Sequence, residues 1–358
     1  MSGEAAVGRP AAAAVTVTTV TGPISSAELG VTLPHEHLAN DLSAAVQPPR
    51  DANQAILAES TVSADIAWRL REAPYACPDN CGLADTEAMV ESLREFATCG
   101  GGSVIDLTPP GLGRDPAALR DIAERTGLNV VMGSGWYLQR FHPPHLATTG
   151  EDDLAAELVA EFRAPAGPRP GVIGEIGVSP DFTSDERTAL RAACLAQRAL
   201  GVPMFVHLPG WRRRAHEVLD IVLDEQGVAP TGVVLCHMDP SGQDPDYQRG
   251  VADRGVWLEF DMVGMPFLFP GEGQAPPPWE TAGAVRRLVG AGHAGQILLS
   301  HDVFLKAMLP QYGGNGFAYV PTLFAQRLRD VGVEDSVVTS LLRDNPRSLF
   351  DSASGAAG

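Results

Sequence analysis

Short apolar runs alternate with amphipathic stretches along most of the chain. After a first run at 31–33, further runs typical of buried strands cover 103–107, 129–134, 171–176, 202–207, 232–237, 256–260 and 296–300. Most are followed by a segment in which apolar residues recur with helical spacing. Eight alternating strand and helix units predict parallel strands with right-handed crossovers, and therefore a closed (β/α)8 TIM barrel. No Gly-x-Gly-x-x-Gly follows a predicted strand, which argues against a dinucleotide-binding fold.

The regions around these units are less regular. Residues 15–20 and the Gly22-Pro23-Ile24 segment predict a short N-terminal β-hairpin. Residues 39–84 are rich in Pro, Asp and Asn, with one possible helix at 55–71. We expect residues 15–350 to form a single domain, with flexible tails at 1–14 and 351–358, because both ends are rich in Ala, Gly and Ser.

Composition narrows the possible partners. The 358-residue chain has a net charge of −18, which argues against nucleic acid and anionic membranes and leaves a small-molecule substrate. Five cysteines without a disulfide framework, no signal peptide and no apolar run long enough to cross a bilayer predict a cytoplasmic protein. Cys77 and Cys81 are only a weak zinc signal, because no second pair accompanies them. The oligomeric state is left open, and a homodimer is one option.

Six residues of metal-ligand type end or follow the predicted strands. They are His35, His37, Glu175, His207, His237 and Asp302. Active sites of TIM barrels lie at the C-terminal ends of the strands, so these side chains are expected to share one face. Burying such groups without partners is costly. Six ligands exceed the needs of one tetrahedral zinc ion and suit two divalent ions about 3.5–4 Å apart.

Several longer segments carry a family resemblance. They are Thr32–Leu38 (TLPHEHL), Gly113–Asp115, Gly171–Gly177 (GVIGEIG), Val206–His207, His237–Asp239, Phe260–Asp261, Leu299–Asp302 and Asp344–Arg347. Together they resemble the phosphotriesterase family of the amidohydrolase superfamily over nearly the whole chain. The resemblance implies two divalent ions per chain, with zinc favoured and manganese or cobalt as alternatives. It further implies that a hydroxide bridging the ions attacks the substrate.

The resemblance also assigns roles to the six ligands. His35, His37 and Asp302 would hold one metal, His207 and His237 the other, and Glu175 would bridge the two. Asp302 would accept a proton during attack.

Two departures separate the chain from the phosphotriesterases themselves. Those enzymes bridge their metals with a carboxylated lysine, whereas the single lysine here, Lys306, is misplaced for that role. In having a glutamate, Glu175, as the bridge, the chain resembles the phosphotriesterase-homology branch of the family. The segment 313–317 also resembles that branch. The positions that would relay a proton outward are Met262 and Pro240, and neither side chain can carry a proton.

Substrate contacts are expected from the loops that follow the strands. Trp136 and Tyr137 could stack on a substrate or simply pack. Arg212, Arg213 and Arg214 could clamp an anionic group or form a solvated helix start. The segments 264–270 and 273–279 are rich in Pro, Phe and Gly, and they predict an apolar lid.

The resulting prediction is a metal-dependent hydrolase of a carboxyl ester, lactone or amide, anionic small molecules included. Three alternatives remain at this point: a phosphotriester hydrolase, a mononuclear amidohydrolase such as a deaminase, and a metal-binding barrel without enzymatic activity. A mononuclear enzyme would not need the Glu175 bridge.

Overall fold

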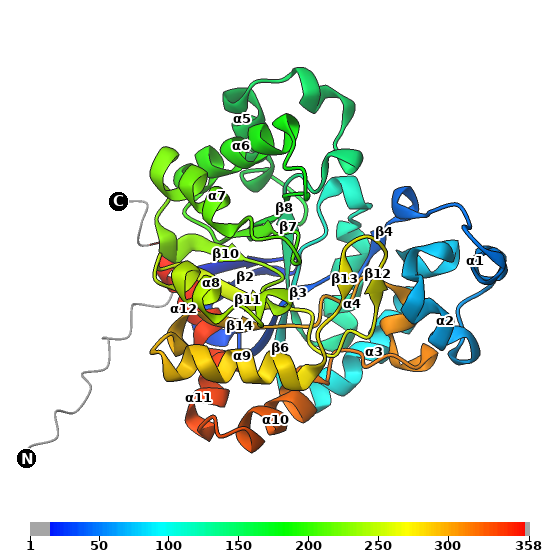
Figure 1. Ribbon diagram of the computed structural model, residues 1–358. Coiled ribbons are helices and arrows are strands. Elements are labelled where there is room, and N and C mark those ends of the chain that lie inside the picture. Colours follow the sequence, from blue (N-terminus) through cyan, green and yellow to red (C-terminus); the bar gives the residue numbers. More distant parts are fainter. Residues whose placement is uncertain (1–14, 355–358) are drawn as a thin grey trace, which may run out of the picture.

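The computed structural model describes residues 15–354 and places eight parallel strands in one sheet, in the order β14-β11-β10-β9-β8-β7-β6-β3. Figure 1 shows this sheet at the centre of the molecule with helices around it. The strands are β3 (Val31–Glu36), β6 (Gly101–Asp106), β7 (Asn129–Ser134), β8 (Val172–Gly177), β9 (Met204–His207), β10 (Val233–Leu235), β11 (Trp257–Phe260) and β14 (Ile297–Leu299). The predicted TIM barrel is confirmed.

The barrel closes between its first and last strands. The backbone N–H of His37 donates to the carbonyl of Val303 at 3.2 Å, and that of Asp302 donates to the carbonyl of His35 at 3.1 Å. These bonds lie just beyond the ends of β3 and β14. Closure therefore brings the first and last predicted ligand segments into direct contact.

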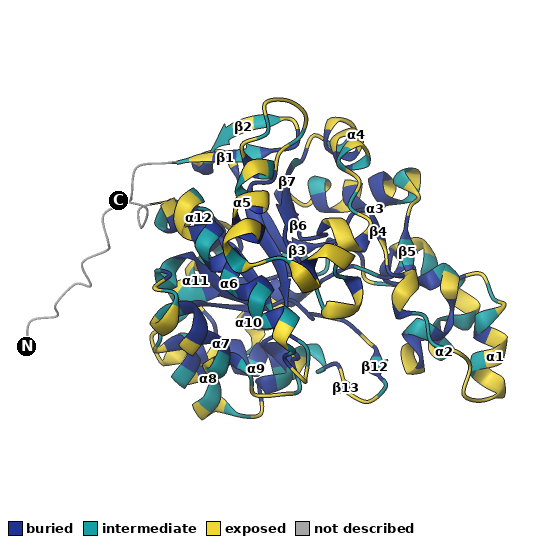
Figure 2. Cartoon of the chain, turned by 90° about the horizontal axis from the view of Figure 1, so that it is seen from above, coloured by how far each residue is buried: buried dark blue, intermediate teal, exposed yellow. Residues whose placement is uncertain are grey.

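Two apolar clusters fill the two faces of the sheet. The smaller one includes Ile105, Val131, Phe205, Val234 and Leu298, which occupy one side of successive strands and fill the barrel. The larger one packs the other side against the surrounding helices. Figure 2 shows the buried strands and the exposed outer faces of the helices.

The helices end where local sequence signals dictate. In α4, the Asp115 side chain accepts the backbone N–H groups of Ala117 and Ala118, and Gly127 closes the helix at φ 74°. The main helices are α3 (Thr86–Thr98), α4 (Pro116–Thr126), α5 (Glu151–Phe162), α6 (Ser184–Leu200), α7 (Ala215–Leu219), α8 (Pro245–Ala252), α9 (Pro278–Gly290), α10 (Ala325–Asp330), α11 (Asp335–Thr339) and α12 (Asn345–Ser354). Most of them match the predicted amphipathic segments.

The N-terminal hairpin is present as β1 (Thr16–Thr19) and β2 (Gly22–Ser25). The possible helix at 55–71 is wrong as a single element, because the structure has α1 (Ala52–Ala58) and α2 (Ala67–Glu72) instead. Val62 lies between them, buried, and its N–H donates to the Asp79 side chain at 2.7 Å. This contact holds the intervening chain out of a helix. Figure 1 shows α1 and α2 as an insertion at one side of the barrel.

Helix α12 was not predicted, because Pro346 in its first turn reads as a helix stop. The chain enters α12 directly from the π-helical segment Ser340–Asp344, and the Asn345 side chain donates to the carbonyls of Ala294 and Ile297. Residues 351–354 therefore belong to this helix and not to a flexible tail. The predicted tails at 1–14 and 355–358 lie outside the described residues. No helix between residues 15 and 354 is long and apolar enough to cross a membrane.

Candidate metal centre and substrate cavity

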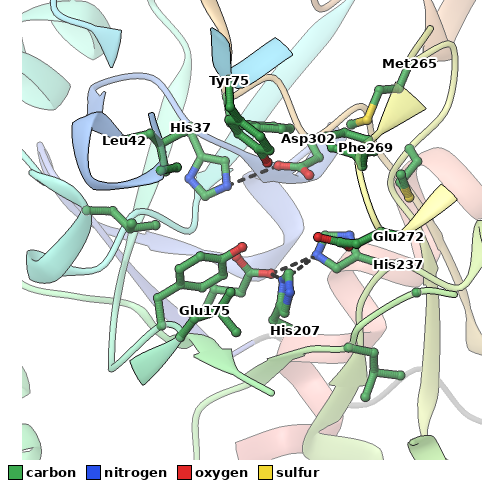
Figure 3. Close-up of a pocket in the computed structure, with 18 of the residues that line it drawn as sticks. His37, Leu42, Tyr75, Glu175, His207, His237, Met265, Phe269, Glu272 and Asp302 are labelled. Atoms are coloured by element: carbon green, nitrogen blue, oxygen red, sulfur yellow. Dashed lines mark hydrogen bonds and ion pairs between the residues drawn. The ribbon is translucent and has the colours of Figure 1, made fainter. Parts of the chain in front are cut away.

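The structure brings all six predicted ligands to the C-terminal mouth of the barrel. Glu175 Oε1 lies 2.8 Å from His207 Nδ1, 3.0 Å from His237 Nε2 and 3.7 Å from His35 Nε2. Asp302 Oδ1 lies 3.2 Å from His37 Nε2 and 3.7 Å from His35 Nε2. All are buried except His207, which is partly exposed. Figure 3 shows five of them around one cavity.

The donor set fits metal ions. Three overlapping groups have ligand atoms within 4.8 Å of one another: His35, His37 and Glu175; His35, His237 and Asp302; and Glu175, His207 and His237. His35 Nε2 is buried without a hydrogen-bond partner, although it faces two carboxylates. Because buried polar atoms rarely go unpaired, this nitrogen is best explained as a metal ligand. Glu175 and His35 each belong to two of the three groups.

A second layer of side chains orients three imidazoles. His35 Nδ1 is 2.9 Å from Glu259 Oε2, His237 Nδ1 is 2.8 Å from Asp261 Oδ1, and His37 Nδ1 is 2.9 Å from the Thr108 hydroxyl. Each contact occupies Nδ1 and directs Nε2 toward the cluster. Carboxylate partners of this kind are usual behind metal-binding histidines.

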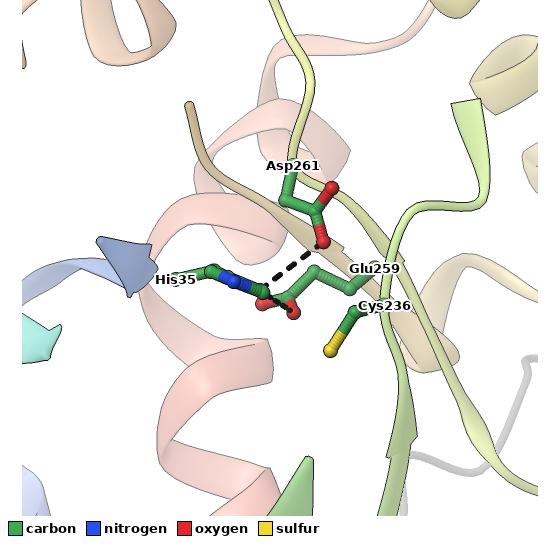
Figure 4. A group of neighbouring side chains, drawn as sticks. All are labelled: His35, Cys236, Glu259 and Asp261. Atoms are coloured by element: carbon green, nitrogen blue, oxygen red, sulfur yellow. Dashed lines mark hydrogen bonds and ion pairs between the residues drawn. The ribbon is translucent and has the colours of Figure 1, made fainter. Parts of the chain in front are cut away.

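Figure 4 shows the buried group behind His35, which comprises Cys236, Glu259 and Asp261. Sequence reasoning overlooked Glu259, although Trp257, Glu259 and Asp261 share one face of their strand by the period of two. Burial raises the pKa of the Cys236 thiol well above its ordinary value.

The carboxylates at the centre favour positive charge on the groups beside them. Burial lowers the pKa of His237, but Asp261 and Glu175 outweigh it and raise that pKa well above its usual range. Burial raises the pKa of Glu175, yet His207 and His35 bring it well below the usual range. The carboxylates thus draw protons onto the imidazoles when no other positive charge is present. Divalent ions would supply the same compensation to neutral imidazoles.

Two ligands adopt an uncommon backbone conformation. His237 has φ 57° and Asp302 has φ 53°, in the left-handed region that residues with a Cβ seldom occupy. Such conformations persist only where surrounding contacts impose them. They mark the ends of β10 and β14 as places where the chain is bent to aim a ligand.

A cavity opens over the cluster, and its walls combine apolar side chains with polar and charged ones. Met262, Met265, Phe269 and Leu42 line it together with Tyr75. Met265 and Phe269 come from the segment predicted to form an apolar lid, which contains the small hairpin β12 (Leu268–Phe269) and β13 (Gly273–Gln274). Met262 faces the cavity at the position where a proton relay was expected to be missing.

The predicted substrate contacts are only partly found at this cavity. Tyr137 lines it, and its ring centroid lies 4.8 Å from that of His207. Trp136 is buried and does not line it. Arg212, Arg213 and Arg214 do not line it either.

The three arginines of this run instead form contacts outside the cavity or are exposed to solvent. Arg213 pairs with Asp244 at 3.5 Å, and Arg214 bonds to Glu217 and to the Pro180 carbonyl. Arg212 is exposed. The cavity lining contains a different arginine, Arg140, which the sequence reasoning did not single out.

Lys306 is bound elsewhere. Its ammonium group contacts both carboxylate oxygens of Asp79, at 2.8 and 3.0 Å, and joins the loop after β14 to the α1–α2 insertion. It is therefore engaged away from the ligand cluster and leaves the bridging position to Glu175. Cys77 and Cys81 are buried, and neither belongs to a metal-ligand group among residues 15–354.

Comparisons with known proteins agree with this geometry. The sequence profile of the phosphotriesterase family matches residues 15–350. The N-acetyltaurine hydrolase of Rattus norvegicus is 32% identical over 338 residues, which cover 92% of this chain and 96% of that protein.

Two solved structures extend the likeness to the fold. A resiniferatoxin-binding protein from Rhodobacter sphaeroides is 46% identical, with a TM-score of 0.91 and coverage of 94% of each chain. The phosphotriesterase homology protein from Escherichia coli, solved with phosphate in its active site, is 27% identical with a TM-score of 0.73, covering 90% of this chain and 99% of that one.

Proposed function

Because the chain belongs to the phosphotriesterase family and its named relatives include hydrolases, we propose that it hydrolyses a small carboxylic amide, ester or lactone with two divalent ions, zinc in first place. The single observation that carries the proposal is the convergence of four imidazoles and two carboxylates, with Glu175 shared between two ligand groups. Bound divalent ions supply acidification of a water and polarisation of the substrate carbonyl oxygen.

The residues of the chain account for the remaining chemistry. His35, His37 and Asp302 would hold one ion and His207 and His237 the other, with Glu175 shared between the two. Asp302 is the proposed general base, because its carboxylate borders the ligand cluster and the cavity and can take a proton from an attacking water.

Among acyl substrates, an amide is favoured by the relative that is named an N-acetyltaurine hydrolase and matches 92% of this chain. The lack of a titratable group at Met262 argues against reliance on the phosphotriesterase proton relay.

The test compares wild type with Asp302→Asn after loading both with zinc and measuring metal content. We expect about two zinc ions per wild-type chain, turnover of at least one amide, ester or lactone, and a fall in kcat of about 10²–10⁴-fold in the variant. Asp246→Asn, at an exposed position, is the matched control. Equal turnover by wild type and Asp302→Asn, or a single ion per active wild-type chain, would contradict the proposal.

A further inference from the structure

Arg140 is the one arginine or lysine among the described residues that line the cavity over the ligand cluster. It lies in the short helix Gln139–Phe141, in the loop after β7. Its guanidinium group has no hydrogen bond or ion pair with any residue between 15 and 354, and it stacks only over the neighbouring Phe141 ring, 5.1 Å from the centroid. Five donors in a fixed planar fork are therefore available to a ligand.

The loop that carries Arg140 is held firmly. The Gln139 backbone N–H donates to Glu186, and the His142 ring contacts the Tyr137 carbonyl at 2.7 Å. Phe141 is buried beneath the loop. Arg140 is thus presented from a fixed backbone, so that little loop ordering is needed when a ligand binds.

Two tyrosine hydroxyls share the cavity with Arg140. Tyr75 and Tyr137 both line it, and neither hydroxyl has a hydrogen-bond partner among the described residues. Burial raises the pKa of each tyrosine well above its usual range, and the nearby Arg140 charge opposes that shift in both. Both hydroxyls can therefore donate to a ligand in the cavity that Arg140 also lines.

We propose that Arg140, assisted by Tyr75, binds an anionic group on the substrate, a carboxylate or sulfonate remote from the bond that is cleaved. This inference rests on the proposed function and assigns its substrate class. Guanidinium groups bind such anions through paired, charge-assisted hydrogen bonds. The metal centre takes the acyl group, and Arg140 selects what is attached to it.

Glu272 provides an internal control of opposite charge. It lines the same cavity from the turn between β12 and β13, and no partner for its carboxylate is found in residues 15–354. Its charge also reaches Tyr75, whose pKa it raises after burial. An anionic substrate is attracted by Arg140 and repelled by Glu272, so neutralising the two residues should have opposite effects.

The experiment uses the zinc-loaded full chain and three probes of similar size. They are the N-acetyl derivatives of 3-aminopropanoate, 2-aminoethanesulfonate and propylamine, which end in a carboxylate, a sulfonate and a neutral methyl group. We expect Arg140→Gln to raise KM for at least one anionic probe by about 10- to 100-fold, with kcat and the KM of the neutral probe nearly unchanged. Comparison of the two anionic probes identifies which acid group the site prefers.

Two further variants sharpen the result. Glu272→Gln should lower KM for the anionic probes, and Tyr75→Phe should raise it by about 3- to 10-fold. An equal rise in KM for neutral and anionic probes in Arg140→Gln, or no rise at all, would overturn the anion site.

Calorimetric binding separates this inference from the proposed function. If wild type hydrolyses none of the probes but binds an anionic one, and Arg140→Gln loses that binding, the anion site stands while the hydrolytic proposal loses its support. If wild type binds neither anionic probe, or if the variant binds them as tightly as wild type, the anion site is wrong.

Discussion

Glu36 accepts two hydrogen bonds from His301, one from the backbone N–H at 3.0 Å and one from the ring Nδ1 at 2.8 Å. The other ring nitrogen of His301 accepts the Val320 N–H at 2.8 Å, which fixes Nδ1 as the protonated atom. Glu36 also accepts bonds from the Ser300 hydroxyl and the Val303 N–H, both at 2.8 Å. His301 and Val303, the two neighbours of Asp302 in the chain, thus both donate to the buried carboxylate of Glu36. Glu36 itself lies between His35 and His37.

The hydrogen bonds that Glu36 accepts should hold the backbone of Asp302 in place. Glu36→Gln replaces one acceptor oxygen with an NH2 group that must face a donor, so Asp302 loses part of the frame that holds its unusual backbone angle. We expect kcat to fall about 10- to 100-fold and the unfolding free energy to fall by about 1–3 kcal/mol, with zinc still bound. Kinetics, metal analysis and denaturant unfolding measure the three effects. Glu124→Gln, on the exposed face of α4, should change none of them.

The bridging role of Glu175 can be tested by metal content. Glu175→Ala removes a ligand shared by two groups, so we expect a loss of at least one ion per chain. Glu175→Lys with bicarbonate should restore part of the metal, because a carboxylated lysine offers a comparable pair of oxygens. Retention of two tightly bound ions by Glu175→Ala would show that Glu175 is not the bridge.

Glu259 and Cys236 form a matched pair of buried neighbours of His35. Glu259→Gln weakens the contact that directs His35 Nε2 into the cluster, and it should lower metal affinity about 10- to 100-fold. Cys236→Ala removes a neutral thiol from the same group and should have a much smaller effect. Competition with a chelator measures both, and equal losses would assign the effect to packing alone.

The raised histidine pKa values predict a pH dependence that reverses with metal. For His35, burial lowers the pKa but Cys236, Asp261 and Glu259 raise it well above 6.5, and the pKa of His237 is raised likewise. The metal-free folded protein therefore holds protons that the unfolded chain has released above pH 6.5. Its stability must fall as the pH rises through the folded-state pKa values.

Metal binding requires neutral imidazoles, so zinc affinity should rise over the same interval. Thermal unfolding between pH 6 and 9, with and without zinc, should show a falling melting temperature for the metal-free protein. The stabilisation by zinc should grow with pH. A metal-free melting temperature that rises with pH would contradict the charge assignment at the centre.

The sequence was informative where apolar runs stop at polar residues. His35, Glu175 and His207 could be located because each follows or interrupts an apolar run that forms a buried strand. In a TIM barrel the C-terminal ends of these strands lie on one face, so the three side chains meet there. Helix α12 was missed at Pro346, a residue that usually interrupts a helix but here directly follows the π-helical segment Ser340–Asp344. The break at Val62 depends on Asp79, seventeen residues away, which no local pattern reveals.

The cavity was harder to predict than the ligand cluster. Arg140 sits in an irregular loop with no periodicity, whereas the run at Arg212–Arg214 is conspicuous in sequence but has its ion pairs on the outside of the barrel. Which charged loop residue borders the cavity depends on how the loop is anchored; Arg140 is exposed next to the buried Phe141. Local composition carries little information about that choice.

The contact between Lys306 and Asp79 has a practical consequence for chemical labelling. Lys306 carries the only side-chain amine in the sequence, so an acylating reagent for primary amines has one lysine to modify. Both Asp79 oxygens hold that amine as an ammonium ion, which reacts only after it leaves the carboxylate and loses its proton. The rate of acylation at Lys306 would therefore report how often its side chain leaves the Asp79 carboxylate.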